Sequence, residues 1–210
     1  MTSPFAFSQK KDSVDVKAFI PTGIRVGYDL VSPGRAALVN TFEGFELSAD
    51  VDIYRYYPTL EIGNSARSFV SVNGSSYTNT GDYWRAGVDV NFMKKDPEKN
   101  MFFLGARYGR STYDEQATII TSDPVWGAYN QTLQNESLTA RWMELTTGMR
   151  IKVWKIFWLG YTARFKFSLK LDDSGDLLTT DVPGYGATDR PTTWGFSYYA
   201  LVKLPVRKVK

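Results

Sequence analysis

The sequence predicts an all-β fold, an eight-stranded antiparallel up-and-down transmembrane β-barrel with four long extracellular loops. Three observations predict it. Apolar and polar residues alternate with period two through most of the chain, which is typical of strands. The connections between these strands alternate between long and short. The apolar face also carries more large side chains than the interior of an eight-stranded barrel can hold.

The first four strands follow from the alternation in the N-terminal half. Residues 23–30 place Ile, Val, Tyr and Leu at the even positions, and residues 45–53 place Phe, Leu, Ala, Val and Ile at the odd positions. A weaker run, 60–63, is the third strand. Residues 84–92 form the fourth, with Trp, Ala, Val and Phe at the even positions.

The last four strands have a clearer alternation. Residues 102–109 are apolar at the even positions, and residues 142–153 are mostly apolar at the odd positions. Residues 157–170 are apolar at every odd position, and residues 194–204 at every even position. A repeat of two over ten or more residues predicts strands rather than helices.

The connections set the two ends of the barrel. Long polar stretches follow the odd-numbered strands, and short links follow the even-numbered ones, so we expect the long loops outside the cell and the short turns in the periplasm. The long stretches are 31–42, 70–81, 114–136 and 171–190, and the short links are 56–58, 94–100 and 154–155. Residues 1–18 and 206–210 are polar tails, the second of them basic, which leaves 19–205 for the barrel.

The size of the apolar face indicates which way it points. The opposite face is rich in Gly, Ser, Thr and charges, which suits a narrow polar lumen. We therefore expect the apolar face to contact a lipid bilayer, with aromatic girdles near the strand ends. The predicted girdle residues are Tyr54, Tyr56, Tyr57, Tyr83, Trp84, Trp142, Trp154, Phe157, Trp158 and Trp194. A soluble lipocalin-like barrel stays open as an alternative, because alternation alone does not fix the direction.

The charges on the strands predict an ion-pair network inside the barrel. Acids predominate on the first four strands and bases on the fifth to seventh, so the two walls carry opposite charge. Charges removed from water must be paired to be tolerated. The predicted network consists of Arg25, Asp29, Glu46, Asp50, Asp52, Glu61, Arg85, Asp89, Arg107, Glu144, Arg150, Arg164 and Lys166.

The composition removes most enzymatic chemistry. The 210 residues include neither cysteine nor histidine, which excludes thiolate metal sites and imidazole bases. A carboxylate pair is left for acid–base work, but the basic wall would keep such acids ionised. We expect no enzyme, no cofactor and no metal site. The net charge of +3 also gives no sign of nucleic-acid binding.

Two of the long loops contain motifs that bear on binding. The third long loop carries Trp126 and Tyr129, aromatic residues suited to contact with a partner protein. The acidic run 172–176 lacks the spacing of an EF-hand loop, so a solvated loop is favoured over a Ca²⁺ site.

Several motifs together resemble an outer-membrane β-barrel family of Bacteroidetes-type bacteria, a domain of unknown function. They are Gly23-Ile24-Arg25-Val26-Gly27-Tyr28-Asp29, Phe42-Glu43-Gly44-Phe45-Glu46, Phe103-Leu104-Gly105-Ala106-Arg107-Tyr108-Gly109 and Trp142-Met143-Glu144-Leu145. The resemblance covers roughly residues 20–205. It implies the outer membrane of a Gram-negative bacterium, a signal peptide not included in this sequence, and an outer-membrane protein or lipoprotein partner.

Three function hypotheses follow from these observations. The first is a non-enzymatic outer-membrane barrel that serves through its loops as a scaffold or subunit of an envelope protein complex. The second is a narrow pore or small-solute channel between the two charged walls. The third is a soluble lipocalin-like carrier.

Overall fold

A closed antiparallel barrel of eight strands forms the body of the protein in the computed structural model, which describes residues 19–93, 96–123, 127–171, 175 and 177–206. The order around the ring is β1-β10-β7-β6-β5-β4-β3-β2, which confirms the predicted eight-stranded antiparallel barrel. Its strands are β1 (Gly23–Asp29), β2 (Phe42–Asp52), β3 (Tyr56–Val70), β4 (Ser76–Asn91), β5 (Met101–Asp123), β6 (Gly127–Trp154), β7 (Phe157–Leu171) and β10 (Thr192–Pro205). The predicted tails, 1–18 and all of 206–210 except Val206, lie outside the described residues.

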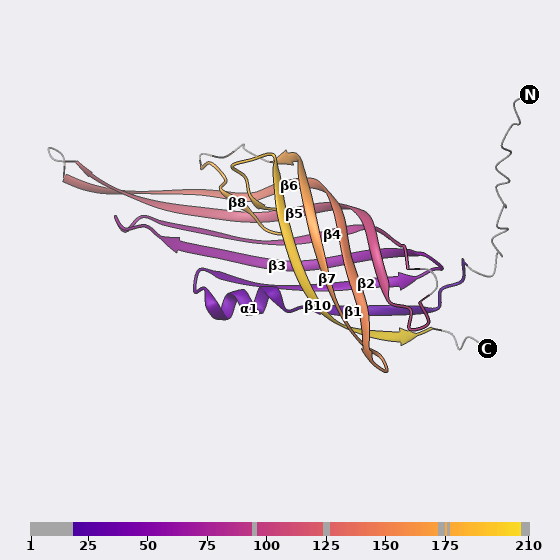
Figure 1. Ribbon diagram of the computed structural model, residues 1–210. Coiled ribbons are helices and arrows are strands. Elements are labelled where there is room, and N and C mark those ends of the chain that lie inside the picture. Colours follow the sequence, from indigo (N-terminus) through magenta and orange to yellow (C-terminus); the bar gives the residue numbers. More distant parts are fainter. Residues whose placement is uncertain (1–18, 94–95, 124–126, 172–174, 176, 207–210) are drawn as a thin grey trace, which may run out of the picture.

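Three short elements lie in the connections. Helix α1 (Val31–Leu38) follows β1, and a two-stranded sheet of β8 (Asp181–Val182) and β9 (Gly186–Ala187) lies between β7 and β10. Figure 1 shows α1 and β8 toward the end of the barrel opposite the short turns. The first and last strands close the ring, with Gly23 paired to Pro205 and Asp29 to Tyr199. None of the helices among the described residues is long and apolar enough to span a membrane.

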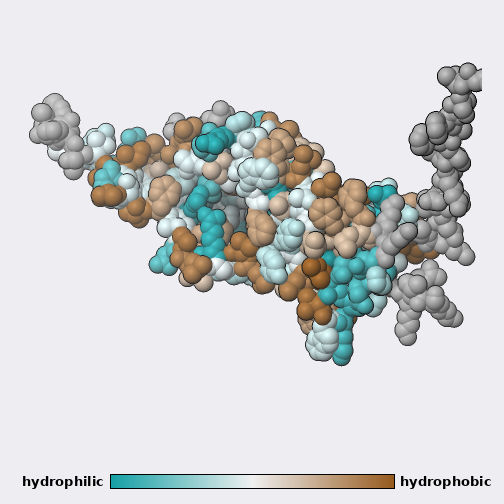
Figure 2. Space-filling model, viewed as in Figure 1, coloured by the Kyte–Doolittle hydropathy of each residue, from teal (hydrophilic) through white to brown (hydrophobic). Residues whose placement is uncertain are grey.

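The apolar face of the sheet points outward. Along β1 every second residue from Gly23 is buried, and the apolar residues between them, such as Ile24 and Val26, are exposed. In the other strands, outward and inward residues also alternate. Leu104 and Leu145 therefore lie on the outside, while Arg107 and Glu144 are buried. Figure 2 shows brown apolar side chains spread along the outside of the strands. The lumen therefore holds the charges and the exterior holds the large apolar residues.

Four of the predicted girdle aromatics point into the barrel instead. Tyr57, Tyr83, Trp142 and Trp158 are all buried, so their assignment to an outer girdle is wrong. The prediction relied on their position near strand ends. The direction of a side chain depends on its parity along the strand, and Trp142 shares the inward parity of Glu144.

The strands on one side of the barrel are longer than the sequence indicated. Residues 76–81, 114–123 and 127–136, expected in loops, continue β4, β5 and β6. The hairpin of β5 and β6 stays paired to its tip, where Asp123 faces Gly127, and Figure 1 shows it projecting from the barrel. Polar residues predominate on both faces of these segments, so they lack the regular alternation that identifies a half-buried strand.

The outward apolar residues on β5 and β6 end at the same height. Tyr108 and Met143 face each other across the pair, and the next outward pair toward the tip is Arg110 and Arg141. On β4 the residue beside Arg110 is Trp84, whose ring lies 5.7 Å from that of Tyr108. This change from apolar to charged marks one limit of an apolar belt, and the hairpin beyond it is outside the belt.

Candidate functional site

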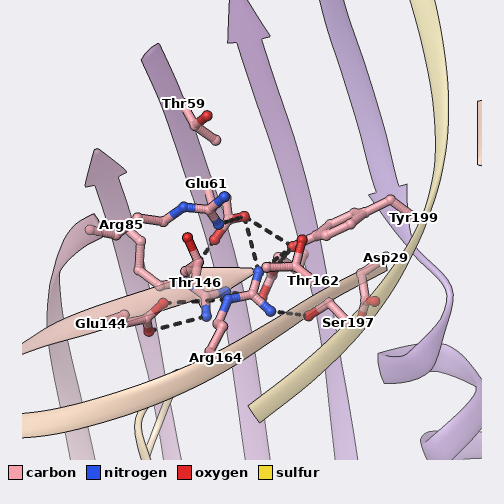
Figure 3. A network of polar contacts seen from close by, with 12 residues as sticks. Asp29, Thr59, Glu61, Arg85, Glu144, Thr146, Thr162, Arg164, Ser197 and Tyr199 are labelled. Carbon is pink, nitrogen blue, oxygen red and sulfur yellow. Dashed lines mark hydrogen bonds and ion pairs between the residues drawn. The ribbon is translucent and has the colours of Figure 1, made fainter. Parts of the chain in front are cut away.

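Glu61 on β3 lies at the centre of the charged cluster in the lumen (Figure 3). Its carboxylate accepts a hydrogen bond from Arg164 at 3.0 Å and forms ion pairs with Arg85, also at 3.0 Å, and with Arg107. The hydroxyl of Tyr199 donates to the same carboxylate at 3.1 Å. Glu61 is 0% exposed, so protein groups alone satisfy its charge.

Two further glutamates extend this cluster across the barrel. Glu46 on β2 accepts hydrogen bonds from Tyr83 at 2.7 Å and from Arg85, and lies 3.3 Å from Arg164. Glu144 on β6 accepts from the indole of Trp142 at 2.7 Å. Its ion pairs with Arg85 and Arg164 are 3.5 and 3.4 Å long.

The pairs of Arg164 join opposite sides of the ring. Arg164 comes from β7, and β3, which carries Glu61, is the strand farthest from β7 around the ring. Arg107 on β5 also connects Glu61 to Asp89 on β4, at 2.8 Å from the second carboxylate. The two walls of opposite charge are therefore linked through the lumen, which these side chains fill.

A second group of charges lies closer to the short turns. Arg25 on β1 donates to Asp50 on the adjacent β2 at 2.8 Å, and its guanidinium lies 4.6 Å from the ring of Tyr57. Asp52 pairs with Lys203 on β10 at 2.7 Å. The ion pairs of this group join neighbouring or nearly neighbouring strands, and Arg25 also donates across the lumen to the sulfur of Met101 on β5, at 3.0 Å.

Three of the thirteen predicted residues are buried without an ion pair among the described residues. Arg150 donates to the carbonyl of Tyr161 and the hydroxyl of Thr162, both at 2.9 Å. Lys166 donates to two carbonyls in the connection before β10. Asp29 accepts from the backbone of Ser32 at the start of α1 and from the backbone of Tyr198. The structure thus buries all thirteen residues and brings the other ten into ion pairs.

Several residues of the site were missed by the sequence reasoning. Tyr199, Tyr83 and Trp142 donate to the glutamates of the central cluster, and Lys203 pairs with Asp52. Parity could have identified Tyr199, which alternates with the outward residues of its strand. Tyr83 and Trp142 were assigned to the girdle, and Lys203 was not among the predicted lumen residues.

The connection between β7 and β10 closes one mouth of the lumen. Val182 and Tyr185 are fully buried against Tyr83, Leu138 and Trp142. The ring of Tyr185 lies 5.8 Å from that of Trp142. We call the described part of this connection, residues 177–191, the plug. It lies toward the end of the barrel opposite the short turns (Figure 1).

The plug is fixed by polar contacts from β7 and from β3. Lys166 on β7 donates to the carbonyls of Gly184 and Tyr185, at 2.7 and 2.9 Å. Asp181 pairs with Arg67 on β3 at 2.8 Å. Burial raises the pKa of the Asp181 carboxyl above its ordinary value, although the nearby Arg67, Arg35 and Lys166 act in the opposite direction.

The predicted partner-binding loop is only partly described. Trp126 lies outside the described residues, as do all residues of the acidic run 172–176 except Gly175. Tyr129 lies on β6 near the tip of the projecting hairpin and is 55% exposed. Within the described ranges, no group of three or more acidic side chains is arranged to hold a metal ion.

Comparison with known proteins gives a family and two similar folds. A family model described as a domain of unknown function, DUF6048, matches residues 2–209. The crystal structure of Neisserial surface protein A is similar over 88% of this chain and 96% of its own, with 12% identity and a TM-score of 0.40. Ail, the attachment invasion locus protein of Yersinia pestis, solved with the heparin analogue sucrose octasulfate, is similar over 87% and 97%, with 11% identity and a TM-score of 0.40. A comparison with curated proteins found no match.

Proposed function

The chain belongs to the DUF6048 family, and from this premise we propose that it is a non-enzymatic outer-membrane scaffold. In this proposal the barrel anchors the β5–β6 hairpin in the bilayer, and the hairpin binds a partner protein of an envelope complex. The observation that carries the proposal is the combination of a filled, ion-paired lumen with a hairpin that extends beyond the apolar belt.

The distribution of side chains supports a membrane location. Large apolar residues such as Leu104, Leu145 and Phe196 face outward, whereas the lumen holds buried arginines and glutamates. A soluble carrier barrel needs the reverse arrangement, with an apolar interior for its ligand. Closed barrels that present an apolar exterior to lipid are typical of outer membranes.

The lumen supports a scaffold over an enzyme. Glu46, Glu61 and Glu144 each lie within ion-pair distance of two or more arginines. A carboxylate enclosed by arginines and buried in the lumen is out of reach of a substrate, so it is poorly placed to act as a general acid or base. We infer that the central cluster stabilises the barrel and does not carry out a reaction.

A filled lumen predicts that the barrel does not conduct ions. We expect the purified protein to give no current steps in a planar bilayer, because Arg164 and Glu61 span the lumen and the plug covers one mouth. The measurement is single-channel recording over a range of voltages, with a porin as the positive control. Regular steps that scale with protein concentration would contradict the closed lumen and favour the pore hypothesis.

The hairpin is long enough to reach a partner well away from the bilayer. A transmembrane strand needs about 9–11 residues, whereas β5 has 23 and β6 has 28. At about 3.3 Å per residue, β5 extends over about 75 Å, compared with about 30 Å for a hydrocarbon core. The polar part beyond Arg110 and Arg141 is therefore available for contact.

The outer half of the hairpin has unpaired strand edges. Pairing of β5 with β4 stops at Thr118, and pairing of β6 with β7 stops at Ala140. Among the described strands, none pairs with the outer edge of β6 from Gly127 to Thr139. Such an edge is a template for an added strand, and a two-stranded ribbon is only marginally stable by itself.

The charge of the hairpin indicates the chemistry of the partner. Residues 111–140 contain four acids and no lysine or arginine. Two copies of this edge would repel each other, so we propose that the partner contributes a basic extended segment that adds to β6. Tyr129 would supply an aromatic contact beside the edge.

Site-specific photo-crosslinking tests this docking site. With the crosslinker at Tyr129, we expect one defined adduct in native membranes, and none with the crosslinker at the exposed Leu178 of the plug. Glu136→Lys should abolish the adduct by reversing a charge of the hairpin. Asp189→Lys, the same reversal at an exposed residue of the plug, should leave it intact.

A second variant separates docking from folding. Replacing residues 119–131 by Asn-Gly joins Thr118 to Thr132, which already face each other, through a two-residue turn. This variant should fold normally, as judged by its heat-dependent gel mobility, and should lose the partner. If it keeps the partner, or if Glu136→Lys and Asp189→Lys behave alike, the hairpin is not the docking site.

A further inference from the structure

The wall of the barrel has a notch above β1. β1 pairs with β2 only as far as Leu47, and with β10 only as far as Tyr199. Beyond these positions, residues 42–46 of β2 pair with β3, and residues 192–198 of β10 pair with β7, but they do not pair with each other. Helix α1 lies across this gap, as Figure 1 shows, and contacts both β2 and β10.

A cavity of about 280 Å³ lies in the notch. Its outer wall comes from α1, from Phe42 on β2 and from Trp194 and Phe196 on β10. Its inner wall comes from β3, β7 and the plug, with Arg67, Lys166 and Asp181. The cavity thus joins the outer surface of the barrel to the charged mouth of the lumen.

Cations exceed available acids in this cavity. Lys166 is 6% exposed, and its described partners are two carbonyls. Arg35 on α1 has its guanidinium 4.4 Å from the ring of Phe42 and forms no ion pair with a described residue. Arg67 pairs with Asp181. Arg85, Arg164 and Glu46 also line the cavity, where both arginines pair with Glu46. Lys166 and Arg35 are therefore left without an ion pair to a described carboxylate.

Asp29, the second acid near α1, does not neutralise the remaining cations. Both oxygens of the Asp29 carboxylate accept hydrogen bonds, from the backbone and hydroxyl of Ser32 and from the backbone of Tyr198. A buried ammonium whose hydrogen bonds all go to neutral acceptors gains from an anion placed beside it. The cavity is therefore suited to a negatively charged group.

The rim of the notch is apolar. Trp194 and Phe196 on β10 are 73% and 55% exposed, and Phe45 and Leu30 are exposed on the neighbouring segments. Tryptophans are enriched at the level of lipid headgroups. A ligand that places its anionic group in the cavity would extend its remaining part over these outward side chains.

We propose that the notch binds an anionic amphiphile, with a phosphate group held by Lys166, Arg67 and Arg35 and an acyl chain lying over Trp194 and Phe196. A phosphate has several acceptor oxygens, so it can pair with cations that come from different elements. Guanidinium groups bind phosphate in a bidentate manner, through two parallel hydrogen bonds. The site is separate from the β5–β6 hairpin, so it goes beyond the scaffold proposal and stands or fails independently of partner binding.

Native mass spectrometry of the full chain in a non-ionic detergent tests this site. The probes are dioleoyl phosphatidic acid, dioleoyl phosphatidylcholine and inorganic phosphate. We expect phosphatidic acid to saturate at one molecule per chain, and the other two to show at least tenfold weaker binding. Equal binding of inorganic phosphate would overturn the role of the acyl chain, and equal binding of phosphatidylcholine would overturn the role of the cations.

Charge variants localise the binding. Lys166→Gln and Arg35→Gln should each weaken phosphatidic acid binding at least fivefold. The matched control is Lys170→Gln, which removes an exposed lysine of the same strand β7 outside the cavity and should have no effect. Arg35 is exposed on α1, so its variant keeps the test valid if Lys166→Gln does not fold. Equal affinity in Arg35→Gln and Lys170→Gln would overturn the assignment to the notch.

Discussion

Replacing Glu61 by glutamine is expected to lower the free energy of unfolding by about 3–5 kcal/mol, the usual cost of removing one partner from a buried ion pair. The change keeps the shape of the side chain and removes its charge. Arg85, Arg107 and Arg164 then remain close together with one fewer carboxylate. Glu46, Glu144 and Asp89 retain partners but do not replace the central charge.

The measurement is reversible urea unfolding in lipid vesicles, followed by tryptophan fluorescence. Glu43→Gln is the matched control, because Glu43 is exposed on β2, and it should change stability by less than about 0.5 kcal/mol. Combining Glu61→Gln with Arg107→Gln should cost less than the sum of the two single changes. Equal stability of the Glu61 and Glu43 variants would show that the cluster contributes nothing to folding.

Replacing Leu104 by arginine is expected to destabilise the protein in a bilayer by about 2–4 kcal/mol, as for a charge on the lipid face of a barrel near the midplane. Leu104 points outward, is 50% exposed and faces Thr147 within the apolar belt. An arginine there must leave water for hydrocarbon or distort the bilayer to reach its surface.

Gln116→Arg is the control for the lipid-facing substitution. Gln116 lies on the same strand with the same outward parity, but in the polar hairpin beyond Arg110. The control should unfold like the unchanged protein in vesicles. If the two arginine variants are equally stable, or if the protein folds in buffer without lipid or detergent, the belt does not face a membrane and the soluble carrier hypothesis gains support.

The faces of the strands could be predicted from the sequence, but their lengths could not. Within the apolar belt each strand has an apolar face that points outward and a polar face toward the lumen, which imposes a repeat of two. The repeat stops at Tyr108 and Met143, beyond which the outer face becomes polar. Backbone pairing keeps β5 and β6 extended to the tip of the hairpin, and pairing leaves no pattern in the residue types.

The residues that line the charged lumen could likewise be predicted from the sequence, whereas the ion pairs between them could not. Parity and the opposite charges of the two walls identify residues such as Glu61 and Arg164 as inward-facing. The pairing depends on the relative heights of the strands around the ring, which follow from the register between them. For this reason Arg150 lies beside Tyr161 and Thr162 rather than a carboxylate, and Lys203 rather than an arginine pairs with Asp52.

Closure of the ring has a consequence for how the chain can be assembled. The strands that close it, β1 and β10, come from opposite ends of the described sequence. Glu46 near the start depends on Tyr199, 153 residues later, and on Arg164. An N-terminal fragment would bury acids before their counter-charges exist, and contacts of such long range form slowly. We therefore expect folding of the barrel to be favourable only once both ends of the chain are present.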